Sequence, residues 1–163
     1  MLIVDNKLDA ELSSNGNRPL MCRGIRGAIT VNHDNPAEIL EATRELMETI
    51  VRLNDINPNN VASVYLTTTT DLTATYPALA VRQMGWLDVA LLCGHEMAVP
   101  DGLPRCIRAL IHWNTTKTAH EIAHVYMREA IVLRPDLKNR PSIRPIQMTP
   151  MDAAFKMLLA DIS

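Results

Sequence analysis

Residues 23–30 read RGIRGAIT, a stretch with the composition of a β-strand that nevertheless carries two arginines. Side chains of a strand point alternately to its two faces, so Arg23 and Arg26 face opposite sides. Arg23 shares its face with Ile25 and Ile29. The face of Arg26 carries only small neighbours: Cys22, Gly24, Ala28 and Thr30. A small anionic ligand needs open space beside a fixed positive charge, and this strand is therefore a candidate wall of an anion site.

Three further arginines lie in apolar segments. Arg108 is part of CIRALI, Arg134 ends IVLR, and Arg82 belongs to PALAVRQMG. A buried guanidinium group without an anion is costly, because desolvation of the charge is not compensated. Two explanations stay open at this point: a shared anion site, or separate local pairs such as Arg134 with Asp136.

Composition narrows the class of protein. The chain has 163 residues, 47% hydrophobic and 21% charged, which suits one globular domain. Its net charge of −2 and its six aromatic residues give no basic or stacking surface for nucleic acid. The sequence predicts no membrane span and no signal peptide. Its cysteines are odd in number and form no CxxC pair, which indicates free thiols and a cytoplasmic protein: Cys22, Cys93 and Cys106.

The order of elements predicts an α+β fold with a mixed sheet and flanking helices. The clearest helix spans 35–54, because Asn35 is a good N-cap and Pro36 suits the first turn. Its expected apolar stripe contains Ile39, Ala42, Thr43, Leu46, Met47, Ile50 and Leu53. Strands are expected at 21–31, 61–69, 86–93, 104–113 and 130–137, and further helices at 76–85 and 118–127.

The pattern also predicts three regions along the chain. Residues 1–20 form a polar N-terminal extension, and 21–137 form the folded domain. Residues 138–163 form a proline-rich connector followed by an amphipathic helix, which begins near Thr149 and Pro150.

Residues 120–124 read HEIAH and match the HExxH pattern of zinc hydrolases. On a helix, His120 and His124 would share one face, with Glu121 as the general base. A third ligand is also required, but no histidine follows and the only later glutamate is Glu129. A surface helix without a metal is therefore the favoured interpretation, and a zinc hydrolase is the less favoured alternative.

Five blocks, in order, carry a resemblance to a known family: RGIRGAITV (23–31), YPALAVR (76–82), LLCGHEM (91–97), CIRALI (106–111) and HVYMREAIVLRPDL (124–137). Together they closely resemble the monofunctional chorismate mutases of the Bacillus type. The resemblance implies a homotrimer, a pseudo-barrel of mixed sheets, with active sites between subunits. It also implies the pericyclic rearrangement of chorismate to prephenate in aromatic amino acid biosynthesis, with no cofactor and no metal.

The resemblance implies roles for nine residues. Arg26 and Tyr126 would hold a substrate carboxylate, and Arg108 would hold a carboxylate and the ether oxygen of the breaking bond. Cys93 and Glu96 would bind the ring hydroxyl. The mouth of the cleft would be walled by Tyr76, Arg82, Leu133 and Arg134.

Three positions depart from the family pattern, and one of them is Tyr76, which stands where an apolar aromatic residue is common. Leu79 stands where a lysine is usual, and Leu92 stands where a threonine is usual. The departures at Leu79 and Leu92 keep open a second class of function, a non-catalytic trimer that binds a small carboxylate.

Overall fold

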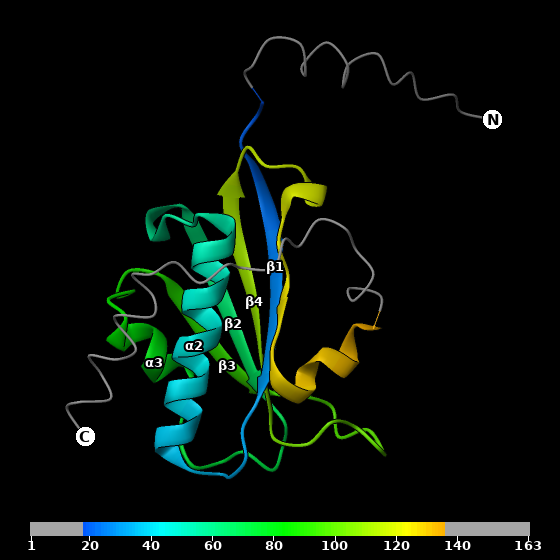
Figure 1. Cartoon of the computed structure of the whole chain (residues 1–163). Coiled ribbons are helices and arrows are strands. Elements are labelled where there is room, and N and C mark those ends of the chain that lie inside the picture. The colour runs from blue at the N-terminus through cyan, green and yellow to red at the C-terminus, as the bar shows by residue number, and fades with distance from the viewer. Residues whose placement is uncertain (1–17, 136–163) are drawn as a thin grey trace, which may run out of the picture.

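The computed structural model describes residues 18–135, which form one five-stranded sheet with helices against it (Figure 1). The elements are β1 (Met21–Thr30), α2 (Pro36–Asn54), β2 (Val61–Thr68), α3 (Ala78–Gln83), β3 (Ala90–His95), β4 (Cys106–Thr115) and β5 (Val125–Tyr126). Short 3₁₀ helices span Pro58–Asn60, Ala119–Glu121 and Arg128–Leu133.

The sheet is mixed, with the strand order β3-β2-β4-β1-β5. β4 lies at the centre and pairs antiparallel with both β1 and β2. The outer pairs, β2 with β3 and β1 with β5, are parallel. The predicted α+β class and the mixed sheet are therefore confirmed.

Helix α2 begins and ends where local chemistry favours it. The side chain of Asn35 accepts a hydrogen bond from the N–H of Ala37, and Pro36 occupies the first turn. Asp55 ends the helix in the left-handed conformation, with φ of 58°. The predicted stripe is buried except for Leu53, which is half-buried, and Asn54 is buried in addition.

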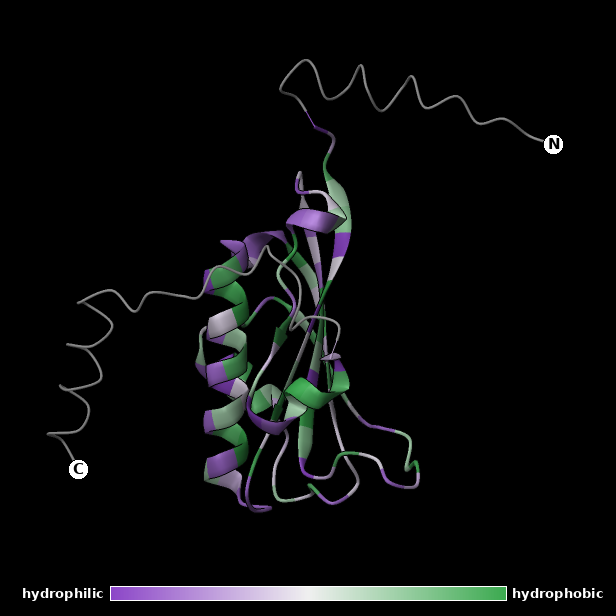
Figure 2. Cartoon of the chain, turned by 45° about the vertical axis from the view of Figure 1, so that its right-hand side comes forward, coloured by the Kyte–Doolittle hydropathy of each residue, from purple (hydrophilic) through white to green (hydrophobic). Residues whose placement is uncertain are grey.

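The hydrophobic core lies between α2 and one face of the sheet. Figure 2 shows hydrophilic and hydrophobic residues alternating along α2, as an amphipathic helix requires. The helix approaches β1 most closely at Gly27, where a Cβ atom would lie 2.7 Å from Cδ1 of Ile50 and 3.0 Å from Cδ1 of Leu46. A glycine is therefore needed at this position for close packing.

Within residues 18–135, no α-helix covers the opposite face of the sheet. This open face keeps three large side chains exposed: Leu92 at 54%, Tyr65 at 45% and Leu110 at 36%. Arg26 and Arg108 project from the same face, because both line the cavity described below.

Two predicted elements were wrong. Residues 118–127 form a single 3₁₀ turn followed by the short strand β5, not a helix. The cause is tertiary: the side-chain amide of Asn54 accepts from the N–H of Ala123 at 2.8 Å and donates to its carbonyl at 2.9 Å. Asn54 thus acts like a neighbouring peptide group and holds this segment extended beside β1.

The strand predicted at 130–137 was also wrong over its described part, because residues 128–133 form a 3₁₀ helix; residues 136 and 137 lie outside the described residues. Its Ala130 packs against Ala28 and Cys106, whereas Ile131 and Val132 are exposed. The edge of β1 is already occupied by β5, which leaves this segment no place beside β1.

The remaining boundaries shift by a few residues. The strand expected at 86–93 begins only at Ala90, because Trp86 and Val89 pack into the core instead. The predicted N-terminal extension falls almost entirely, and the predicted tail helix entirely, outside the described residues. None of the helices within 18–135 has both the length and the apolar character that crossing a bilayer would require.

The close packing at Gly27 predicts that Gly27→Ala destabilises the fold. Overpacking against α2 should lower the free energy of unfolding by about 1–3 kcal/mol, measured by urea denaturation. Gly24→Ala is the matched control on the same strand, since its Cβ would meet only Cδ1 of Leu110 at an ordinary 3.6 Å. Equal stability of the two variants would contradict the packing argument.

Candidate functional site

A cavity of about 450 Å³ lies on the open face of the sheet. It brings together six of the nine site residues expected from the sequence: Arg26, Glu96, Arg108, Tyr126, Leu133 and Arg134. The remaining lining residues are Gly27, Ala28, Tyr65, Thr67, Ala109 and Leu110.

Strand register explains why residues distant in sequence meet here. Ala28 of β1 pairs with Arg108 of β4 on one side and with Tyr126 of β5 on the other. Directly paired residues project from the same face, so the small side chain of Ala28 leaves open space between Arg108 and Tyr126. Arg26, two residues earlier on β1, points to the same face.

The charges of the cavity are unbalanced. Three guanidinium groups, from Arg26, Arg108 and Arg134, face one carboxylate, Glu96, which gives a local net charge of +2. Nη1 of Arg108 lies 3.4 Å from Oε2 of Glu96, and the guanidinium of Arg134 stacks 5.9 Å from the ring centre of Tyr126. Such a cavity suits a small ligand with two negative charges.

Arg108 is one of the half-buried cations of the cavity. Its side chain is 39% exposed, and its buried Nε has no hydrogen-bond partner among the described residues. Arg26, by contrast, is exposed, as is Arg82. The sequence led us to expect buried guanidinium groups. Arg108 and Arg134 are half-buried, so the expectation holds in part for them, but it fails for Arg26 and Arg82.

The other three expected site residues do not line this cavity. Tyr76, Arg82 and Cys93 line a second hollow of about 490 Å³ beside α3 and the edge strand β3. Cys93 pairs with Leu66, a fully buried core residue, and so projects from the helix-covered face of the sheet. Within one chain, Cys93 and Glu96 thus do not share a cavity.

Three side chains of the cavity were not expected from the sequence: Tyr65, Thr67 and Leu110. Tyr65 and Thr67 belong to β2, whose β-branched run gave no sign of which face points to a site. The hydroxyl of Thr67 donates a hydrogen bond to Oε1 of Glu96. Alternation along the strand could have placed these residues on one face, but only the pairing of β2 with β4 places them beside Arg108.

Two carboxylates anchor the loops around the sheet. Asp71 accepts hydrogen bonds from the N–H of Arg105, which has a positive φ of 47° just before β4. Asp34 accepts from Ala74 and Thr73, and the backbone hydrogen bond from Ala74 is the largest cause of its lowered pKa. This second anchor holds the loop that leads to Tyr76.

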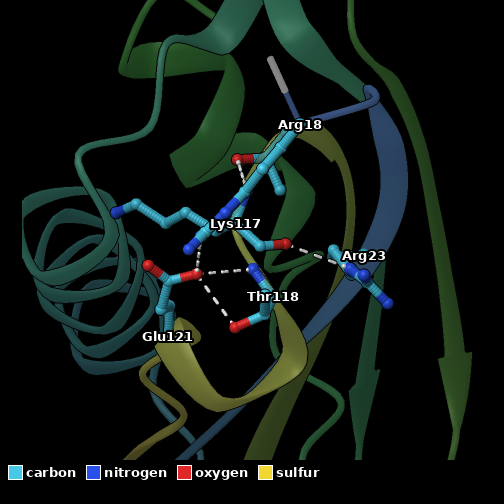
Figure 3. Close-up of polar contacts among 6 residues, drawn as sticks. Arg18, Arg23, Lys117, Thr118 and Glu121 are labelled. Carbon is cyan, nitrogen blue, oxygen red and sulfur yellow. Dashed lines mark hydrogen bonds and ion pairs between the residues drawn. The ribbon is translucent and has the colours of Figure 1, made fainter. Parts of the chain in front are cut away.

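The HEIAH segment has a structural role in the described chain. Its Glu121 carboxylate accepts from the N–H and hydroxyl of Thr118 and from Arg18 at 2.7 Å (Figure 3). The backbone hydrogen bond from Thr118 is the largest cause of the lowered pKa of Glu121. Nδ1 of His124 accepts from the N–H of Arg26 at 3.1 Å, and His120 lies in the exposed 3₁₀ turn. The helix that the zinc-hydrolase alternative requires is not formed.

The third cysteine, Cys106, is buried in a small apolar cluster with Ala28 and Ala130. Burial is the main cause of the raised pKa of its thiol, and the nearby Arg108 guanidinium opposes the shift. A buried thiol with a raised pKa is a poor nucleophile, so Cys106 contributes packing and not chemistry.

Comparison with known proteins identifies relatives over the described domain. The family model described as chorismate mutase type I matches residues 22–137. The chain is 49% identical over 120 residues to chorismate mutase AroH of Thermus thermophilus, covering 73% of this chain and 98% of that protein. It is 44% identical over 119 residues to chorismate mutase AroH of Bacillus subtilis, covering 72% of this chain and 94% of the relative.

A solved structure agrees with these sequence relatives. The chorismate mutase from Clostridium thermocellum superposes with a TM-score of 0.67 at 40% identity. The match covers 68% of this chain and 98% of that one.

The capping role of Glu121 predicts a pH-dependent loss of stability in Glu121→Ala. The pKa of Glu121 is lower in the folded state than in the unfolded state, so its contribution is present above the unfolded pKa. It is lost as the pH falls through the folded pKa. Thermal unfolding should therefore show a lower midpoint for the variant at pH 7 and a smaller difference at acidic pH.

Glu41→Ala, at an exposed position of α2, is the matched control and should change the midpoint little at either pH. A zinc ion that purifies with the wild type and is lost with Glu121→Ala would contradict a purely structural role.

Proposed function

Because the chain belongs to the chorismate mutase type I family, we propose that it is the isomerase that converts chorismate to prephenate. The observation that carries this proposal is the cavity on the open face, in which Arg26, Arg108 and Arg134 face the single carboxylate of Glu96. Chorismate is a small dianion, and a net charge of +2 complements its two carboxylates. The family membership and the relatives support the same reaction.

The rearrangement breaks a C–O bond and forms a C–C bond in one step. It needs neither a nucleophile nor a proton relay, so a protein accelerates it by conformation and charge. Fixed cations hold the two carboxylates in the compact shape that brings the reacting carbons together. A cavity with three guanidinium groups, two of them on paired strands, is suited to this task.

Arg108 has the central role in this proposal. Negative charge grows on the ether oxygen as the C–O bond stretches, and a guanidinium already aimed there stabilises the transition state more than the ground state. The Nε of Arg108 has no hydrogen-bond partner among the described residues, and its Nη1 is only loosely paired with Glu96, so the guanidinium keeps donors for this purpose. The planar guanidinium can contact a carboxylate and the ether oxygen together, which a lysine ammonium does less well.

The remaining residues of the cavity receive supporting roles. Arg26 and Tyr126 hold a carboxylate, while Leu133 and Arg134 form the wall beside Tyr126. Glu96 accepts a hydrogen bond from the ring hydroxyl.

We further propose that the active form is a homotrimer with composite sites. Tyr76, Arg82 and Cys93 lie in a separate hollow, so they reach a substrate in the cavity only if a neighbouring copy supplies them. The open face carries exposed Tyr65, Leu92 and Leu110, which supports self-association. The unpaired state of the three cysteines supports a cytoplasmic location.

The role of Arg108 predicts a severe loss of turnover in Arg108→Ala. Removal of one donor to a developing oxyanion typically costs about 100- to 1,000-fold in kcat, and loss of a full charge should cost at least that much. The measurement is the fall in ultraviolet absorbance as the ring diene of chorismate is consumed. Arg108→Lys should recover only a small part of the rate.

Urea denaturation of the same variants is the control, because the loss must not come from unfolding. Near-normal turnover of Arg108→Ala would contradict the proposed electrostatic role of Arg108. Tight binding of chorismate by the wild type without any conversion would favour the non-catalytic carboxylate-binding protein instead.

Composite sites predict complementation between two inactive variants. Arg108→Ala damages the cavity and Arg82→Ala damages the second hollow, so each pure variant should be weakly active. Random mixing of the two chains should restore roughly a quarter of the sites, because some sites then draw an intact half from each chain. Mixed refolding, followed by the turnover assay and light scattering, tests this; mixtures no more active than their components would contradict composite sites.

A further inference from the structure

Thr67 is a polar side chain of the cavity to which the proposed reaction assigns no role. It lies in β2 and pairs with Arg108 of β4 on one side and with Gly94 of β3 on the other. The three positions therefore project from the open face in one row across the sheet. Gly94 has no side chain, and nothing lies within 4 Å of where its Cβ would be, so Thr67 borders open space on that side.

Glu96 enters this space from the chain that follows β3. Its N–H donates to the carbonyl of Thr68 at 2.8 Å, which fixes its backbone at the end of β2. Its carboxylate is then held at two points. Oε1 accepts a hydrogen bond from the hydroxyl of Thr67, and Oε2 lies 3.4 Å from Nη1 of Arg108.

We propose that Thr67 is a positioning residue that holds Glu96 apart from Arg108, so that both groups stay available to the substrate. This inference rests on the proposed function. The Glu96–Arg108 distance of 3.4 Å is longer than a typical charge-assisted hydrogen bond, so the pair is not fully closed. The hydroxyl of Thr67 secures the other carboxylate oxygen and opposes that closure.

The chemistry of the site makes this separation useful. A carboxylate that closed onto Arg108 would neutralise the guanidinium that has to face the ether oxygen. It would also turn away from the ring hydroxyl. A β-branched threonine in a strand has restricted χ1 rotation, so its hydroxyl is already directed before substrate binds. Thr67 thereby pre-organises two charged groups at once.

The test compares Thr67→Val, Thr67→Ser and wild type in the full-length chain. Valine keeps the shape and loses the donor, so kcat/KM should fall about tenfold or more, the effect typical of one hydrogen bond to a charged group. Serine keeps the donor and should restore most of the rate. The matched control is Thr68→Val on the same strand, whose hydroxyl contacts the carbonyl of Leu72 and Nδ1 of His95, neither of which lines the cavity. It should leave kcat/KM near the wild-type value.

A double-mutant cycle with Glu96→Ala separates positioning from a merely structural role. If Thr67 acts through Glu96, Thr67→Val should have little further effect once Glu96 is absent. Additive losses, an unchanged Thr67→Val, or no rescue by serine would each overturn the inference.

The same variants distinguish this inference from the proposed function. A wild type that converts no chorismate would refute the proposed function itself. The role of Thr67 is then judged from calorimetric binding of prephenate. Equal dissociation constants for Thr67→Val and wild type would overturn it, and at least tenfold weaker binding with rescue by serine would support it.

Discussion

The antiparallel pairing of β1 with β4 is the constraint on which the site depends. Ala28 lies opposite Arg108 in this register, with Leu110 opposite Arg26, so both arginines project from the open face. A slip by one residue would turn one strand's arginine into the core beneath α2. Ile25 and Ile29 of β1 oppose such a slip, because both side chains are fully buried on the other face of the sheet. Core packing on one face of β1 and β4 therefore makes the two arginine side chains project from the other face.

The two faces of the sheet perform separate tasks. The face under α2 and α3 carries the core and supplies stability, whereas the open face carries charges whose main value lies in a ligand. Three guanidinium groups beside one carboxylate repel one another; two of them, Arg26 and Arg108, are carried by paired strands, and Arg134 follows the 3₁₀ helix Arg128–Leu133. The uncovered face and the second hollow beside α3 are both surfaces on which a neighbouring copy could complete a site.

Much of the fold was predictable because its signals are local. The cap at Asn35, the stripe of α2 and the β-branched run of β2 depend on neighbours in sequence, and these elements formed as expected. The segment 118–127 was wrong because its conformation depends on the distant side chain of Asn54 and on the free edge of β1. Periodicity reports neither of these contacts.

The sequence by itself determined the candidate residues and the family: the arginines in apolar segments, Glu96 after its strand, and the ordered blocks that mark the family. Tertiary structure alone decided how they are grouped. It joined six of the expected residues in one cavity, put Cys93 on the opposite face, and brought Thr67 into contact with Glu96. The physical reason is that strand pairing and face selection arise from contacts between segments far apart in the chain, and residue types and spacing within one segment do not encode those contacts.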